Sequence, residues 1–210
     1  MDIYASDEEK GEEIKQWWRD NGRSVITSCI LGAAVIFGGR YWMTYQQTVT
    51  SNASVAYQQV IIAINDDDRT IAEDKTQQLF SEFAGTPYAV FAAFEMAAQS
   101  TESVDARSYL EWVMANADLS AHKELARFRL AQLLMSDEKY DQSLTLIDAS
   151  ESVAYSSLLL ELRGDILVAQ GKTSAARTAY QNAILDLLQG EPRKQLLQVK
   201  LNDVAQSNDS

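Results

Sequence analysis

The sequence contains few of the residues from which disulfides, metal sites and catalytic sites are usually built. Its 210 residues include one cysteine, one histidine, two prolines and nine glycines. A lone cysteine cannot form a disulfide within the chain, and a lone histidine excludes a metal site made of several histidines. Because helix-breaking residues are so few, we expect an all-α fold.

Positive charge is also scarce. Lys and Arg number 18 against 30 Asp and Glu, which gives a formal net charge of −12. Proteins that bind nucleic acid neutralise its phosphates with a basic surface, so we expect no nucleic-acid partner. The length suffices for one folded domain with a short appendage and excludes a multidomain enzyme.

One segment, residues 24–39, is uncharged and apolar. It is shorter than the ~20 residues that usually cross a membrane. However, Arg40 can extend its charge to the membrane surface, and aromatic rings, which favour the membrane interface, follow at Tyr41, Trp42 and Tyr45. We predict a single transmembrane helix over residues 24–45.

Two alternatives to a membrane anchor fit the sequence less well. A cleavable signal peptide is disfavoured because the preceding segment is acid-rich, and because the first suitable cleavage site, Ser51-Asn52-Ala53, lies far beyond the apolar run. The core helix of a soluble domain is disfavoured by the aromatic residues that follow the run.

The orientation follows from the basic residues near the span. Four precede it, Lys10, Lys15, Arg19 and Arg23, whereas after Arg40 the next is Arg69. Because basic residues stay on the cytoplasmic side, residues 1–23 should be cytoplasmic and residues 46–210 should lie on the far side of the membrane. The exported part contains 13 Lys and Arg against 23 Asp and Glu, a net charge of −10.

The cytoplasmic segment shows helical spacing at Ile14, Trp17 and Trp18, which predicts a short amphipathic helix that stops at Asn21-Gly22. The two tryptophans either lie in the membrane interface or dock a membrane-protein partner. Residues 1–11 are expected to be disordered.

A second candidate for partner contact lies within the span. Small residues follow one stripe of the helix, at Ser28, Gly32, Val35 and Gly39. Such a stripe allows another membrane helix to approach closely, although glycine is common in membrane helices generally. Partner packing and no special role therefore both stay open.

Helical periodicity resumes after the span, and no stretch alternates strictly enough to predict a strand. The predicted helices cover residues 53–64, 70–83, 88–99, 103–116, 120–135, 139–148, 153–170, 173–188 and 193–205. Residues 65–68 should form a turn that ends the first of them. Short loops predict that neighbouring helices pack as antiparallel hairpins.

The clearest repeat has the small-small-aromatic-small spacing of a tetratricopeptide repeat. Gly164, Ala176, Tyr180 and Ala183 are separated by 12, 4 and 3 residues, with Leu160 and Leu167 at the large positions and a turn at Gly171-Lys172. The small residues should allow close helix approach, while Tyr180 fills the space towards the next pair.

A weaker copy lies 33 residues earlier, at Ala131, Ser143, Ile147 and Ser150, and a third, with a shortened turn, lies around Met96, Ala97 and Ala106. Residues 53–204 have room for about four units of 34 residues, followed by a capping helix. The prediction is therefore a short tetratricopeptide-like helical solenoid. The alternative is an unrelated helical bundle.

The order of several short motifs resembles the YfgM family. These are the N-terminal MDIY, Asp20-Asn21-Gly22, Gly39-Arg40-Tyr41-Trp42, the ASVAY of residues 53–57, Leu162-Arg163-Gly164-Asp165 and residues 198–202. The resemblance implies an inner-membrane ancillary subunit of the SecYEG translocon with a periplasmic repeat domain. It also implies association with the chaperone PpiD and transfer of translocating or unfolded clients to periplasmic chaperones, without catalytic residues or cofactors.

The residues themselves also disfavour catalysis. His122 should be a solvated surface residue, Cys29 would lie in hydrocarbon where a thiolate is unfavourable, and Asp66, Asp67 and Asp68 lack the spacing of a calcium loop. Two alternatives to a secretion-linked binding module remain. One is a regulator of a stress-response signalling pathway that acts through its cytoplasmic tail, and the other is a hydrolase.

Overall fold

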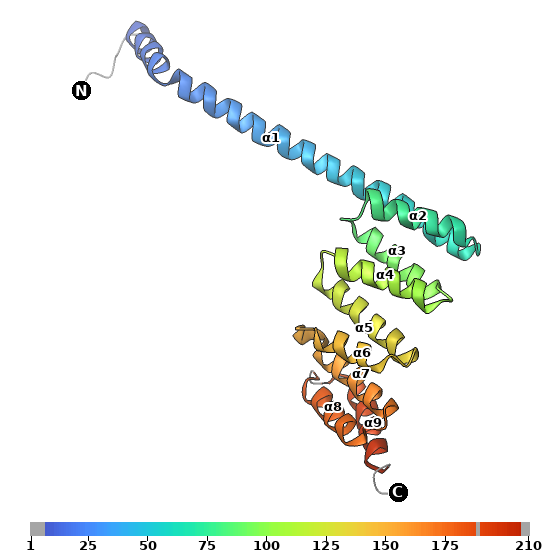
Figure 1. Ribbon diagram of the computed structural model, residues 1–210. Helices are drawn as coiled ribbons and strands as arrows, with labels where there is room; N and C mark the ends of the chain where they lie inside the picture. The colour runs from blue at the N-terminus through green and yellow to red at the C-terminus, as the bar shows by residue number, and fades with distance from the viewer. Residues whose placement is uncertain (1–6, 188–189, 207–210) are drawn as a thin grey trace. The chain divides into compact units, whose positions relative to one another are not determined.

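The computed structural model describes residues 7–187 and 190–206, and every regular element in these residues is helical (Figure 1). The all-α prediction is confirmed. The chain divides into two compact units, one that ends at Asn52 and one that begins at Ala53. The first unit consists of most of helix α1 (Asp7–Asn65), and the second contains the remainder of α1 and the packed helices that follow.

The predicted helix stop at Asn21-Gly22 is wrong, because α1 continues through both residues. The Trp18 indole covers Gly22, where an added Cβ would lie 3.3 Å from the ring. The Asn21 side chain donates to the Trp17 carbonyl at 3.1 Å, so it satisfies the helix instead of competing with it. The expected disorder is also wrong for residues 7–11, which are helical; residues 1–6 lie outside the described part.

The second unit is a row of short helices. They are α2 (Arg69–Glu82), α3 (Pro87–Gln99), α4 (Ser103–Asn116), α5 (Ser120–Ser136), α6 (Tyr140–Asp148), α7 (Ser156–Ala169), α8 (Thr173–Leu185) and α9 (Arg193–Gln206). The predicted helix 153–170 is divided into a 3₁₀ turn, η1 (Val153–Tyr155), and α7. The predicted helix 173–188 ends earlier, at Leu185, and residue 188 lies outside the described part.

From α2 to α9 consecutive helices pack against each other, and the second unit buries three apolar clusters. The largest joins α1 to α5 through residues such as Val60, Leu79 and Val113. A second joins α5, α6 and α7, and a third joins α7, α8 and α9 around Leu197. The predicted tetratricopeptide-like solenoid is therefore confirmed, with α9 covering the last pair.

Three of the turns share one backbone geometry. Asp67, Glu138 and Gly171 have φ of 57°, 60° and 73°, and in each case the next residue donates its N–H to a carbonyl of the preceding helix. A residue in this left-handed conformation lets the chain reverse direction directly after the helix. The conformation is strained for any residue with a side chain. The α3–α4 connection lacks it, in agreement with its predicted shortened turn.

Candidate partner-binding surfaces

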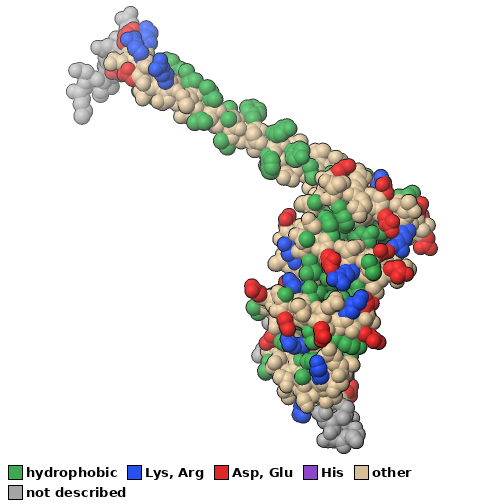
Figure 2. Space-filling model, in the orientation of Figure 1, with side chains coloured by type: hydrophobic (Ala, Val, Ile, Leu, Met, Phe, Trp, Pro, Cys, Tyr) green, Lys and Arg blue, Asp and Glu red, His purple; other side chains and the backbone are tan. Residues whose placement is uncertain are grey.

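The apolar segment of α1 leaves its large side chains uncovered. In the described residues it is the one helix long and apolar enough to cross a membrane. Ile30, Val35 and Phe37 are each more than half exposed. Figure 2 shows hydrophobic side chains along this helix and charged ones gathered near its N-terminal end. Such exposure is costly in water and favourable in lipid.

The predicted contact residues of this helix lie on its surface. Trp17 and Trp18 are 54% and 52% exposed. The stripe of Ser28, Gly32, Val35 and Gly39 is exposed along its whole length, and no atom comes within 4 Å of a Cβ built on Gly32 or Gly39. Nothing in the described chain covers these residues, so their role in partner binding stays a prediction.

The residues singled out in the best repeat meet between α7 and α8. Ala176, Tyr180 and Ala183 are buried in one cluster with Leu167, and Leu160 packs against it. Gly164 faces the Tyr180 ring so closely that an added Cβ would lie 2.3 Å from its Cε1. Tyr180 also shares its cluster with Leu197 of α9, and Lys200 Nζ lies 5.9 Å from its ring centre. The ring therefore fills space towards the next helix, as predicted, and also packs against Gly164 within its own pair.

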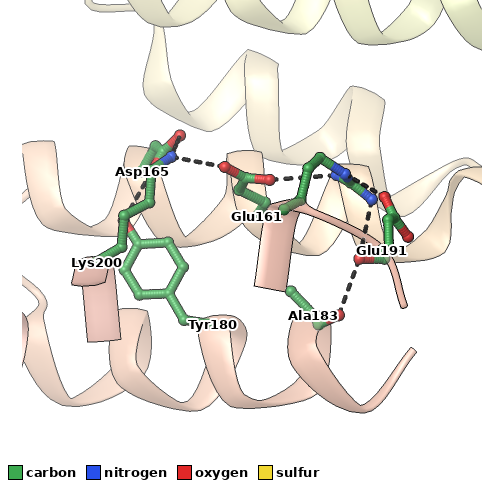
Figure 3. Close-up of polar contacts among 8 residues, drawn as sticks. Glu161, Asp165, Tyr180, Ala183, Glu191 and Lys200 are labelled. Atoms are coloured by element: carbon green, nitrogen blue, oxygen red, sulfur yellow. Dashed lines mark hydrogen bonds and ion pairs between the residues drawn. The ribbon is translucent and has the colours of Figure 1, made fainter. Parts of the chain in front are cut away.

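The Tyr180 hydroxyl belongs to a polar network that fastens α9 to α7 (Figure 3). Tyr180 donates to Asp165 Oδ1 at 2.7 Å, and Lys200 Nζ donates to both Asp165 oxygens at 2.8 Å and to Glu161 at 2.9 Å. Arg193 donates to the other oxygen of Glu161 at 3.3 Å. The charged groups at this end of the solenoid are therefore engaged with one another.

The network shifts the pKa values of two of its members. Burial raises the pKa of Tyr180, and the hydrogen bond to Asp165 raises it further because an ionised hydroxyl cannot donate. Burial lowers the pKa of Lys200, but its hydrogen bonds to Asp165 and Glu161 outweigh burial and leave that pKa raised. Both groups therefore keep their protons around neutral pH.

The weaker repeat copy uses a hydroxyl where the better copy has a methyl group. Ser143 is fully buried, and its Oγ donates to the Ala131 carbonyl at 2.7 Å. A buried hydroxyl with a partner has little net cost, which explains how serine replaces alanine at a close helix contact.

A third surface, which local spacing in the sequence does not reveal, crosses α1, α3 and α5. These are the first helices of the successive pairs α1–α2, α3–α4 and α5–α6. Its rings are Tyr57 on α1, Tyr88, Phe91 and Phe94 on α3, and His122 on α5, and we call it the aromatic surface. Tyr57 lies 5.9 Å from Tyr88 and 6.2 Å from Phe91, ring centre to ring centre. Phe91 lies 5.8 Å from His122.

Charged groups flank these rings. The Arg129 guanidinium lies over the Phe94 ring at 4.8 Å from its centre. Burial raises the pKa of Tyr57, and the nearby Glu95 carboxylate raises it further. Glu95 and Arg129 form no ion pair within the described part of the chain, whereas Lys200 and Arg193 are both paired.

The residues considered for chemistry have other roles. His122 is not the solvated surface residue that we expected, because it is half-buried and lies edge-on to Phe91 and Phe94. Cys29 is exposed on the apolar segment of α1. The turn predicted for residues 65–68 covers residues 66–68, because α1 includes Asn65, and the Asp68 side chain accepts the Ile71 N–H at 3.1 Å to cap α2.

Fold and surfaces together define the class: a tetratricopeptide-like helical repeat protein that carries one N-terminal helix of membrane-spanning length. A family model described as a tetratricopeptide repeat-like domain matches residues 15–206. The chain belongs to this family, and its resemblance to the YfgM proteins is confirmed by relatives that match over nearly the full length.

Three relatives illustrate the similarity, and each is named an ancillary SecYEG translocon subunit. The protein from Haemophilus influenzae is 27% identical over 97% of this chain and all of its own length. The Escherichia coli protein is 25% identical over 98% of this chain, and the Neisseria gonorrhoeae protein 24% over 97%, again over their full lengths. No solved structure matches the chain.

Proposed function

We propose that this protein is a non-enzymatic, membrane-anchored subunit of the SecYEG translocon. The observation that supports this most is the full-length match to relatives named for that complex, which includes both the apolar helix and the repeats. Helical repeats offer extended surfaces for binding other proteins, and an anchor keeps such a surface at the membrane.

In this proposal residues 24–45 cross the inner membrane, residues 1–23 are cytoplasmic, and residues 46–210 are periplasmic. The four basic residues before the span support this orientation. Protease added to spheroplasts should therefore remove the repeats. Protection until the cells are lysed would contradict it.

The repeat domain would bind the chaperone PpiD and pass translocating or unfolded clients to periplasmic chaperones. Purification of the full chain from detergent-solubilised membranes should recover SecYEG and PpiD together. Recovery of neither, under conditions in which SecYEG itself stays assembled, would contradict the proposal.

The small-residue stripe would make the contact inside the membrane. Photo-crosslinkers at Gly32 and Val35 should capture a partner more efficiently than those at Ile30 and Ala33, which lie on other faces of a helix with about 3.6 residues per turn. Equal labelling at all four positions would instead favour recognition by Trp17 and Trp18 or by the repeats. Removal of residues 1–23 tests the first of these, and also the alternative of a stress-response regulator that acts through its tail.

A further inference from the structure

We propose that the aromatic surface binds an extended, unfolded polypeptide segment that carries large apolar side chains next to a lysine or arginine. The inference rests on the proposed function and deepens it, because it names the chemistry of the client and the residues that bind it. It needs no enzyme activity and no residue of the membrane span.

The ring spacing suits an extended chain. Neighbouring ring centres lie 5.8–6.2 Å apart on the path from Tyr57 through Phe91 to His122. In an extended chain, side chains on one face recur about every 7 Å. Successive apolar side chains of such a segment can therefore each meet one ring as the segment crosses from α1 to α5.

The surface keeps apolar area available to a partner. Phe91 is 38% exposed although it lies at the centre of the cluster, and Phe94 is buried beneath as its floor. Aromatic rings and arginine provide much of the binding energy at protein interfaces. The rings contact one another edge-on or tilted, which holds them in place before a ligand arrives.

The charges select the ligand. Glu95 is half-buried beside Tyr57 and has no cationic partner among the described residues, so a lysine or arginine of the segment gains an ion pair there without breaking one. Arg129 can donate to the carbonyl groups of an extended backbone, which have no partners within their own strand. The net charge of −10 on residues 46–210 also favours a basic segment.

The test measures fluorescence anisotropy with the full chain in detergent micelles. The probe is a short labelled peptide in which phenylalanines alternate with serines and a lysine stands at each end. Phe91→Ala should weaken binding about tenfold. Glu95→Gln preserves shape and should weaken binding about fivefold. A peptide with glutamates in place of the lysines should bind weakly to the parent and more tightly to Glu95→Gln, because that substitution removes a like charge.

Two matched variants serve as controls. Leu185→Ala removes an exposed apolar side chain from α8, and Glu102→Gln removes an exposed carboxylate before α4, both away from the aromatic surface. Both should bind the probe like the parent. Circular dichroism shows whether each variant is folded. If Phe91→Ala unfolds the chain, peptide binding by Glu95→Gln alone tests the inference.

The inference is overturned if Phe91→Ala and Glu95→Gln bind like the parent, or if the controls lose as much affinity. Co-purification with SecYEG from the same cells separates this result from the proposed function. Retained co-purification with unaltered peptide binding overturns the inference alone. Loss of co-purification by the parent, with peptide binding that the two variants weaken, overturns only the translocon proposal.

Discussion

The close contact between Gly164 and Tyr180 predicts that Gly164→Ala destabilises the protein when the Tyr180 ring is present and stabilises it when the ring is absent. In Gly164→Ala, the new Cβ would lie 2.3, 2.5 and 2.8 Å from Cε1, Cδ1 and Cζ of the Tyr180 ring. The ring cannot easily move aside, because it is 3% exposed and its hydroxyl is bound to Asp165.

The magnitude follows from two opposing effects. Overpacking a filled core costs about 1–3 kcal/mol, and at these distances the upper part of that range applies. Replacing glycine by alanine inside a helix stabilises the folded state by about 1 kcal/mol through its higher helix propensity. Gly164→Ala should therefore lower the free energy of unfolding by about 1–2 kcal/mol. That corresponds to a fall in Tm of roughly 3–6 °C.

The same substitution should be favourable once the ring is gone. In a Tyr180→Ala background, the Cβ at position 164 meets open space, so Gly164→Ala should raise the free energy of unfolding by about 1 kcal/mol. Urea unfolding of the full chain in detergent, followed by far-ultraviolet circular dichroism, measures all four proteins. Gly85→Ala is the control, because no atom lies within 4 Å of its added Cβ. An equal loss in both backgrounds would show that the ring is not the obstacle.

The turns and the polar contacts provide three more tests. Gly171→Ala should lower the free energy of unfolding by about 1 kcal/mol and Glu138→Gly should raise it by up to about as much, because both positions are left-handed. The raised pKa values of Tyr180 and Lys200 mean that the folded state holds these protons more tightly, so this stabilisation is complete below about pH 10 and is lost as the pH rises further. Thermal melts at increasing pH above about 10 should show this loss of stability. The loss should be smaller in Tyr180→Phe. Ser143→Ala should lower the free energy of unfolding by about 1 kcal/mol in urea, because it removes the buried hydrogen bond from the Ser143 hydroxyl to the Ala131 carbonyl.

The helices and the best repeat could be predicted because local spacing determines them. The exact spacing of Gly164, Ala176 and Tyr180 places small and large residues on facing helices. The same reasoning failed at Asn21-Gly22. These residues end a helix only where the helix offers their polar and exposed groups no partner. There the Trp18 ring covers Gly22, and Asn21 donates to the helix itself.

The aromatic surface could not be read from local spacing. Tyr57, Phe91 and His122 come from three separate helices, and within each helix an aromatic residue is indistinguishable from one that faces the core. A usable signal would have required the register of the helix pairs, which places the first helices of successive pairs side by side. For the same reason local spacing predicts a solvated His122, although the residue packs against rings from α3.

The distribution of paired charge argues that binding and stability reside in different pairs of the solenoid. Around α9, Glu161 and Asp165 already accept from Lys200, so a charged partner would gain an ion pair there only by breaking one. Around α3, Glu95 has no ion-pair partner among the described residues and lies beside Tyr57, close to the exposed Phe91 ring, so a basic apolar segment gains contacts there without breaking an ion pair. Variants of the α9 network should therefore lower the free energy of unfolding and leave the peptide affinity unchanged. Variants around Glu95 should lower the peptide affinity and leave the free energy of unfolding unchanged.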